Sequence, residues 1–233
     1  MLKKVILTID VEHDCPPFLS TTDGMQYGMP KLLDLFKNEH VSATFFTTGE
    51  MAVQFPDLMT RIVNEGHELG CHGHTHRKLS ELSYEEADWE ISRSINILKQ
   101  HAKITSFRAP YLSFPDDYLP ILIKHGFLVD SSLSRSEKDI HAKINMPGIK
   151  RIVPNLPCIC FRLPRFLFTR KIKNQDTTIL FMHPWEFIDM SKRGIRFDRY
   201  FNTGDYALNG LKKWIHYFKK NDYRFLKCEE VVS

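Results

Sequence analysis

The fold is indicated first by the run Val5-Ile6-Leu7-Thr8-Ile9, which is followed directly by Asp10-Val11-Glu12-His13-Asp14. A short apolar run of this kind predicts a buried strand, and the acidic residues mark its end. Similar runs recur along the chain and alternate with amphipathic stretches of helical length. This alternation predicts β/α units built on a parallel sheet.

The remaining elements follow from the same patterns. We expect helices at 28–39, 56–65, 84–101, 115–125 and 205–220, and strands at 4–10, 42–47, 68–71, 105–109, 127–130, 178–183 and 223–227. Residues 131–176 show no clean period and contain four prolines, so we predict an irregular insertion there. With no repeat or linker to divide it, we expect residues 1–233 to form a single barrel-like α/β domain.

The third expected helix has the clearest local signals. Its start, Ser83-Tyr84-Glu85-Glu86, has the spacing of a capping box, in which Ser83 and Glu86 satisfy free backbone amides. Its apolar residues fall on one helical face, which we expect to pack in the core: Ala87, Ile91, Ile95 and Leu98.

Composition excludes several classes of protein. The chain has 233 residues, of which 42% are apolar, enough for a packed core. Five scattered cysteines argue against a disulfide framework. No run of 18 apolar residues occurs, and the first strand follows Met1-Leu2-Lys3-Lys4 without the apolar region of a signal peptide. We therefore expect a cytoplasmic protein, with peripheral contact to a membrane as the alternative.

Two clusters of polar residues suggest metal chemistry. Asp10 and Glu12 share one face of the first strand while that strand persists. Histidines occur at positions 72, 74 and 76, and two histidines four residues apart can converge on one divalent ion. Two imidazoles and one carboxylate leave coordination positions for water and substrate. The pattern therefore predicts a metal-dependent hydrolase.

Two further strand ends carry polar side chains. Arg108 ends the strand expected at 105–109, and a guanidinium is suited to pairing with a carboxylate. His183 ends the strand expected at 178–183, where Pro184 stops the ladder. Taken singly, each residue fits a structural role as well as a functional one. Together, four strand ends present polar groups to the same rim of a parallel sheet.

At this point the chain resembles the polysaccharide deacetylases of carbohydrate esterase family four. The motifs occur in the family's order between residue 4 and about residue 185: Thr8-Ile9-Asp10-Val11-Glu12, His72 to His76, Arg108-Ala109-Pro110-Tyr111 and Leu180-Phe181-Met182-His183. Gly49-Glu50 and Asp130-Ser131-Ser132 resemble the corresponding residues of the subgroup that includes intracellular and peptidoglycan-type members. The resemblance implies a distorted (β/α) barrel with parallel strands and a single catalytic metal.

The resemblance also implies a role for each motif residue. Glu12, His72 and His76 would bind the metal, and Asp10 would be the general base, held in position by Arg108. The Tyr111 backbone amide would stabilise the oxyanion, and His183 would protonate the leaving amine. The expected metal is Zn²⁺, with Co²⁺, Ni²⁺ or Fe²⁺ as alternatives.

The chain departs from the family pattern in three places. Glutamate replaces the family's metal-binding aspartate at position 12, so Asp14 is an alternative third ligand, although Glu12 keeps the motif register. Gly73 takes the place of the usual Ser or Thr in the histidine motif. The fourth motif, an aspartate with a nearby tryptophan that tunes the catalytic histidine, is not recognisable around Asp130. The sequence therefore leaves open what sets the pKa of His183.

The expected reaction is removal of an N-acetyl group from an amino sugar in a polysaccharide, an oligosaccharide or a lipid-linked glycan. One alternative keeps the site but changes the substrate to a small non-sugar amide, as in allantoinase-like relatives. The other is a binding protein for a glycan or an anionic surface, without turnover. We expect no nucleic-acid partner, and the sequence does not indicate an oligomeric state.

Charge is distributed unevenly. Residues 1–149 contain 15 basic and 20 acidic side chains, whereas residues 150–233 contain 17 basic and 8 acidic ones. The segment 161–173 interleaves aromatic and basic residues. Such a segment fits a partly buried wall of the substrate cleft, and also fits a surface that contacts an anionic membrane or a nucleic-acid backbone.

Overall fold

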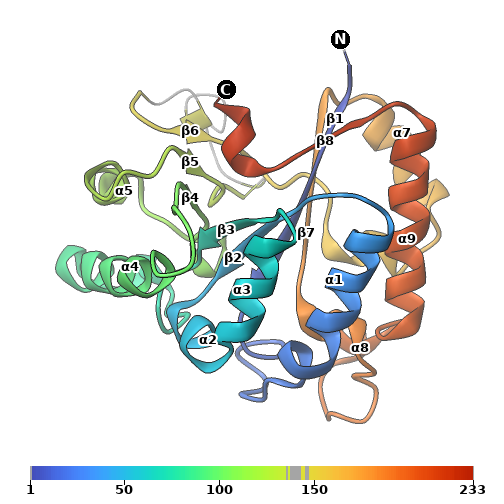
Figure 1. Ribbon diagram of the computed structural model, residues 1–233, viewed down its shortest axis with the longest axis horizontal. Helices are drawn as coiled ribbons and strands as arrows, with labels where there is room; N and C mark the ends of the chain where they lie inside the picture. The colour runs from blue at the N-terminus through green and yellow to red at the C-terminus, as the bar shows by residue number, and fades with distance from the viewer. Residues whose placement is uncertain (1, 135, 137–142, 145–146, 233) are drawn as a thin grey trace. The chain divides into compact units, whose positions relative to one another are not determined.

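The computed structural model describes residues 2–134, 136, 143–144 and 147–232 (Figure 1). Every described strand pairing is parallel, and helices separate most of the strands along the chain, which confirms the α/β class. Contacts group the chain into two compact units. The first unit contains residues 1–43 and 156–226, and the second contains residues 44–155 and 227–233. A single domain over the whole chain stays a prediction.

The first unit is built on three parallel strands. Strand β1 (Lys4–Val11) pairs with β7 (Thr177–Met182) on one side and with β8 (Arg224–Leu226) on the other, and Figure 1 shows the three strands running together. The register sets Ile9 opposite Met182. Asp10 and His183 therefore follow these two paired residues at the same edge of the sheet.

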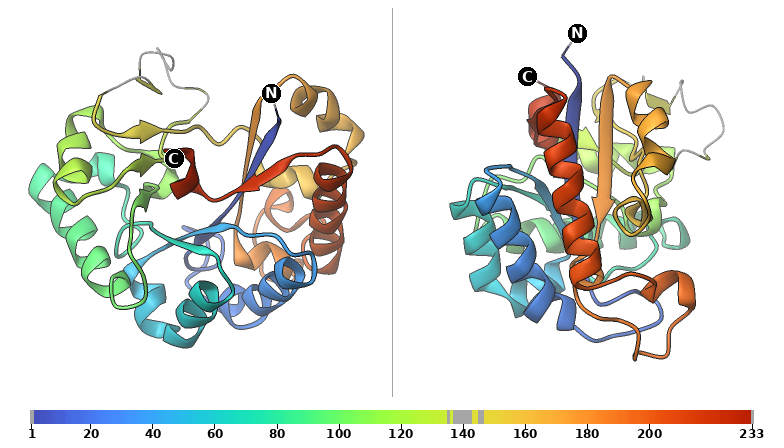
Figure 2. Two further views of the ribbon diagram at one scale, coloured as in Figure 1. Left: turned by 45° about the horizontal axis from the view of Figure 1, so that its top comes forward. Right: turned by 90° about the vertical axis from the view of Figure 1, so that its right-hand side faces the viewer.

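Helices of the first unit cover its strands. Helix α9 (Asp205–Lys220) runs alongside them (Figure 2) and buries Ala207, Leu211, Trp214, Ile215 and Phe218, which recur with helical spacing. The other helices and helical turns of this unit are η1 (Gly24–Gly28), α1 (Met29–Asn38), η5 (Cys158–Phe161), α7 (Phe166–Lys173), η6 (Pro184–Phe187) and α8 (Phe197–Tyr200).

The second unit has a five-stranded parallel sheet. Its strands lie in the order β2 (Thr44–Thr47), β3 (Glu68–Cys71), β4 (Ser106–Phe107), β5 (Val129–Asp130) and β6 (Lys150–Arg151). Its helices and helical turns are α2 (Gly49–Gln54), α3 (Pro56–Asn64), η2 (Leu79–Glu81), α4 (Tyr84–Leu98), η3 (Pro110–Leu112), η4 (Asp116–Tyr118), α5 (Leu119–Lys124) and η7 (Cys228–Val231).

Several sequence expectations are confirmed. The capping box of Ser83 and Glu86 is formed, and the four apolar residues assigned to the core face of α4 are all buried. All five cysteines are free, as their number and spacing indicated. Among the described residues, no helix combines the length and apolarity needed to cross a membrane.

Several expected strands are shorter than predicted, and β4 and β5 differ for reasons that the structure shows. Strand β4 ends before Ala109 and Pro110, because proline has no N–H with which to extend the ladder. Strand β5 ends at Asp130 as predicted but begins only at Val129, because the backbone N–H of Phe127 donates to the Leu122 carbonyl at the end of α5.

The segment 131–176 is not irregular throughout, although residues 135, 137–142 and 145–146 lie outside the described part. It contains strand β6 and helix α7. A two-residue strand has no readable period, and in α7 basic residues occupy much of the helix surface, which obscures an apolar stripe. Helix α2 was also not predicted, because six residues are too few for a helical pattern.

Candidate functional site

The first unit places three predicted site residues at the edge of its sheet. Asp10 and Glu12 at the end of β1 are each only 5% exposed. His183 directly follows β7, and its Nε2 atom lies 3.7 Å from Glu12 Oε1. The parallel pairing of β1 with β7 produces this arrangement, because it aligns the carboxyl ends of both strands.

The second ring nitrogen of His183 is held by a residue that we did not predict. Nδ1 lies 2.9 Å from Glu186 Oε1, which also accepts the backbone N–H of His183 at 3.1 Å. The indole of Trp185 stacks on the imidazole, with 5.1 Å between ring centroids and 20° between planes. Glu186 itself is fully buried. These contacts fix the orientation of the ring, because a carboxylate can only accept the Nδ1 proton.

Arg162 supports Glu186 from the opposite side. Its Nε atom lies 3.3 Å from Glu186 Oε2, and its Nη1 atom donates to the backbone carbonyls of Arg199 and Phe201. Arg162 is 2% exposed. The buried carboxylate is thus flanked by a buried cation, the condition under which a buried ionised group is tolerated.

These surroundings favour the protonated form of His183. Burial by itself would lower the pKa of the imidazole, but the hydrogen bond to Glu186 and the negative charges of Glu12, Glu186 and Asp10 outweigh it and raise the pKa to about 9. A histidine with this pKa is a proton donor at neutral pH. The tuning residue that the sequence left open is therefore Glu186.

Asp14 is occupied within its own loop. Its Oδ2 atom accepts the Thr21 hydroxyl at 2.7 Å and the Asp23 backbone N–H at 2.9 Å, and Oδ1 accepts the Gly24 N–H at 2.8 Å. Burial raises the pKa of Asp14 despite these donors. The carboxylate therefore caps the start of the turn at 23–24.

The second unit holds the histidine motif directly after β3. Nδ1 of His72 lies 2.7 Å from the backbone oxygen of Arg108, and because a carbonyl only accepts, Nδ1 carries the proton. In this tautomer Nε2 carries no proton, and its lone pair points away from the Arg108 oxygen. The rings of His72 and His76 lie 5.2 Å apart between centroids. One histidine of the pair thus has the tautomer that a metal ligand requires.

Glu90 of α4 fixes the loop that carries the two histidines. Its Oε2 atom accepts the backbone N–H groups of His74 and Thr75 at 3.0 and 2.9 Å, and its Oε1 atom accepts the Thr75 hydroxyl. Glu90 is 1% exposed. Gly73 in the same loop has a φ of 74°, a left-handed conformation in which glycine carries no steric penalty.

Arg108 and Tyr111 follow the neighbouring strand β4. Arg108 is fully buried, lies 4.4 Å from the centroid of the Phe46 ring and donates from Nη2 to the Ser131 hydroxyl at 2.9 Å. Tyr111 has a φ of 60°, and its ring centroid lies 4.8 Å from that of His76. A left-handed backbone at a residue other than glycine is costly and is concentrated at functional sites.

Asp130 has a structural role in the second unit. Its carboxylate pairs with Arg151 Nε at 2.9 Å, and Arg151 also reaches Asp116 at 2.7 Å. This agrees with the absence of a recognisable fourth motif at Asp130.

The sequence offered one local signal for the residue that tunes His183: Glu186 stands three positions after His183, the spacing of a capping box. Arg162 and Glu90 had no such signal.

The described residues also include a second group of metal-ligating types. Ligand atoms of Cys158, His183 and Glu186 lie within 4.8 Å of one another. However, Glu186 is engaged by His183 and Arg162, and burial raises the pKa of the Cys158 thiol. A thiol must lose its proton to bind a metal, so these contacts disfavour a metal ion in this group.

Comparison with known proteins identifies the family. The family model described as polysaccharide deacetylase matches residues 3–129. The chain belongs to the polysaccharide deacetylase family. This match covers β1, the histidine loop and Arg108, whereas His183 and Glu186 lie beyond it.

Curated members of the polysaccharide deacetylase family are about a third identical to this chain over the residues that align. A peptidoglycan deacetylase of Helicobacter pylori is 32% identical over 48% of this chain and 39% of its own length. A chitooligosaccharide deacetylase of Bradyrhizobium is 30% identical over 63% of this chain and 67% of its own length. The match thus spans less than half the length of the Helicobacter protein.

Solved structures confirm the fold. A pseudoenzyme of carbohydrate esterase family four from Bacillus anthracis matches 100% of this chain and 66% of its own, with a TM-score of 0.67 and 19% identity. The expected fold of the polysaccharide deacetylase family is thereby confirmed. Because this relative is described as a pseudoenzyme, the fold alone does not establish catalysis.

Proposed function

We propose that the chain is a metal-dependent hydrolase that removes N-acetyl groups from an amino sugar in a polysaccharide, an oligosaccharide or a lipid-linked glycan. The relatives named as peptidoglycan and chitooligosaccharide deacetylases support this reaction class. The observation that carries the proposal is the position of His183, which is held by Glu186 beside Glu12 in surroundings that raise its pKa, because hydrolysis of an amide requires a proton for the leaving amine.

Glu12, His72 and His76 would hold the divalent metal. Their side chains are of the types that ligate divalent metals, and the His72 tautomer places an unprotonated lone pair on Nε2. Two imidazoles and one carboxylate suit Zn²⁺, and also Co²⁺, Ni²⁺ or Fe²⁺. A metal bound there would acidify a water molecule and polarise the amide carbonyl.

The other motif residues would carry the proton transfers. Asp10 would accept a proton from the attacking water, with Arg108 as its partner. The Tyr111 backbone N–H would donate to the developing oxyanion, and the left-handed conformation of Tyr111 supports a specific orientation of this amide. His183 would then give a proton from Nε2 to the departing amine, while Glu186 keeps the ring in place.

The third ligand can be tested by two neutral variants. Asp14→Asn should bind metal like the unmodified chain, because both oxygens of Asp14 already accept hydrogen bonds within their loop. In this variant the side-chain NH₂ group of asparagine would face a hydrogen-bond donor of the loop and could not accept from it. We therefore expect a loss of about 1–3 kcal/mol in the free energy of unfolding. Glu12→Gln should instead lose metal and keep its stability. Calorimetric zinc titration and urea denaturation measure both quantities, and the reverse result would make Asp14 the ligand.

The reaction is tested by acetate release. Zinc-loaded protein should release acetate from N-acetylated chitooligosaccharides or from peptidoglycan fragments, as followed by a coupled acetate assay. Turnover of allantoin without any acetate release would select the allantoinase-like alternative. Binding of the glycans without turnover by the metal-loaded chain would select the binding protein. A lipid-linked substrate and a cytoplasmic location stay predictions from the sequence.

A further inference from the structure

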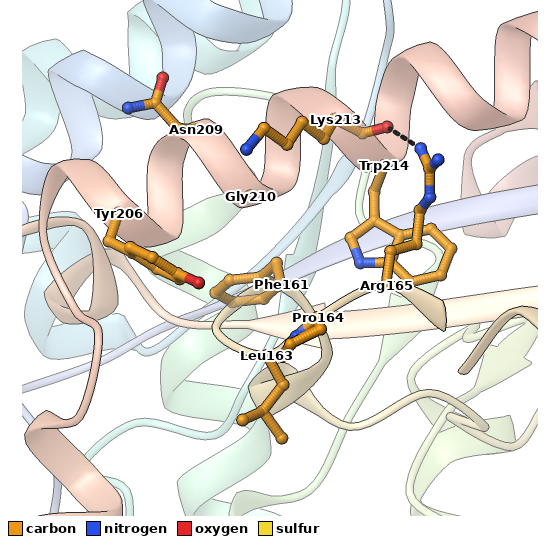
Figure 3. A pocket seen from close by; sticks show the side chains of 9 residues that line it. All are labelled: Phe161, Leu163, Pro164, Arg165, Tyr206, Asn209, Gly210, Lys213 and Trp214. Atoms are coloured by element: carbon orange, nitrogen blue, oxygen red, sulfur yellow. Dashed lines mark hydrogen bonds between the residues drawn. The ribbon is translucent and has the colours of Figure 1, made fainter. Parts of the chain in front are cut away.

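Apart from Arg162, which supports Glu186, the segment 161–173 has no role in the proposed reaction. It contains five basic residues and no acidic one. The structure divides it into the end of η5, a short loop and helix α7, and the loop lies against helix α9 of the same unit (Figure 3). We call the surface formed by residues 163–170 together with Tyr206 and Lys213 of α9 the basic face.

The basic face has a fixed shape. A Cβ atom on Gly210 of α9 would lie 1.8 Å from the Phe161 backbone oxygen, so the helix and the loop approach as closely as glycine allows. Trp214 Nε1 donates to the Cys160 oxygen at 3.0 Å, and Arg165 Nη1 donates to the Lys213 oxygen at 3.3 Å. A cavity of about 330 Å³ lies between loop and helix, with Tyr206 and Lys213 among its lining residues.

Large apolar side chains on the basic face are exposed. Phe166 is 74% exposed, Leu167 is 54% exposed and Tyr206 is 52% exposed. Single exposed apolar residues are common on soluble proteins. Here, however, two are consecutive in the first turn of α7, directly after the loop that lines the cavity. Surfaces that bind at the membrane interface typically combine exposed apolar side chains with neighbouring cations.

The cations of the basic face are not paired with carboxylates of the described residues, although the Arg165 guanidinium packs 5.0 Å from the centroid of the Tyr217 ring. In the part of the chain that the structure describes, no carboxylate pairs with Arg165, Arg170 or Lys213. On a different side of α9, Lys212 and Lys219 are both paired with Glu39. The lysines of α9 that face Glu39 thus share one carboxylate partner, whereas Lys213 on the basic face has none among the described residues.

We propose that the basic face docks on the surface of an anionic phospholipid bilayer. Phe166 and Leu167 enter the boundary between headgroups and acyl chains, while Lys213 and Arg170 contact the anionic headgroups. Interleaved aromatic and basic residues also occur in nucleic-acid interfaces. The consecutive exposed Phe166 and Leu167 favour the bilayer, because it offers an apolar layer in which both can be buried at once.

The experiment is sedimentation with vesicles. The full chain should bind vesicles of phosphatidylcholine with phosphatidylglycerol, should not bind phosphatidylcholine alone, and should be released by 0.5 M NaCl because the attraction to the headgroups is screened. Phe166→Ser/Leu167→Ser and, separately, Arg170→Glu/Lys213→Glu should each lower the partition coefficient at least roughly tenfold. All four side chains are exposed, so the variants should keep their thermal stability.

Matched controls separate the basic face from general surface effects. Lys99→Glu/Lys103→Glu makes the same change in net charge on the second unit, and Tyr27→Ser/Val53→Ser removes two comparably exposed apolar side chains. Both should bind vesicles like the unmodified chain. Failure to bind anionic vesicles, equal weakening by the controls, or tighter binding to duplex DNA that ignores Phe166→Ser/Leu167→Ser would each overturn the proposal.

Discussion

Replacing His76 or His72 by alanine should lower the affinity for Zn²⁺ at least roughly a hundredfold and reduce kcat/KM by at least as much. The reason is that substitutions in the outer shell of a metal site already cost about 10–100-fold, and loss of a direct ligand should exceed this. The affinity is measured by competition with a zinc chelator, and the metal content by elemental analysis of protein reconstituted with zinc.

The same loop provides a matched control. His74→Ala removes a third histidine from the run, but in the structure the ring of His74 packs edge-on against Trp89, with 5.7 Å between centroids. The backbone of the loop remains tied to Glu90 in this variant. We expect normal zinc content and activity within a few-fold of the unmodified chain. Undiminished metal content and hydrolysis in both His72→Ala and His76→Ala would refute the proposed metal centre.

The sequence was sufficient to predict where β1 and β7 end to within about one residue. Apolar runs such as 5–9 and 178–182 are largely buried in a parallel sheet, and the first polar residue after each run marks the edge. Asp10 and His183 could therefore be assigned to an edge from the sequence alone. The register that sets Ile9 opposite Met182 could not, because it depends on how segments more than 170 residues apart pack.

The supporting residues were harder to predict. Glu90 lies on α4, whose sequence has a simple amphipathic pattern. Such a pattern does not show which carboxylate on the helix is buried and which is exposed. Arg162 sits in a segment whose basic residues are mostly exposed. Asp14 seemed available as a ligand because its three hydrogen-bond donors come from a turn with no recognisable motif. Each of these roles depends on tertiary contacts.

Glu186→Gln should lower the pKa of His183 and reduce kcat roughly 10–100-fold with little change in KM. Glu186 raises that pKa both through its hydrogen bond to Nδ1 and through its charge, and the variant loses the charge while keeping an acceptor. In the metal-free protein, NMR titration of the His183 ring should give a pKa of about 9 for the unmodified chain and a lower value for Glu186→Gln.

The direction of the pH effect follows from the role of His183 as a proton donor. The donor form is present below the pKa of His183 and is lost as the pH rises through it, so a lower pKa moves the alkaline fall of kcat to lower pH. Arg162→Lys is the control for structure alone: it removes donors to the carbonyls of Arg199 and Phe201 and keeps a cation near Glu186. It should lower the melting temperature and leave the alkaline fall nearly in place. The contrary result would be a Glu186→Gln variant that loses stability like Arg162→Lys but keeps both the pKa of His183 and the alkaline fall of kcat unchanged. Glu186 would then stabilise the fold without tuning the proton donor.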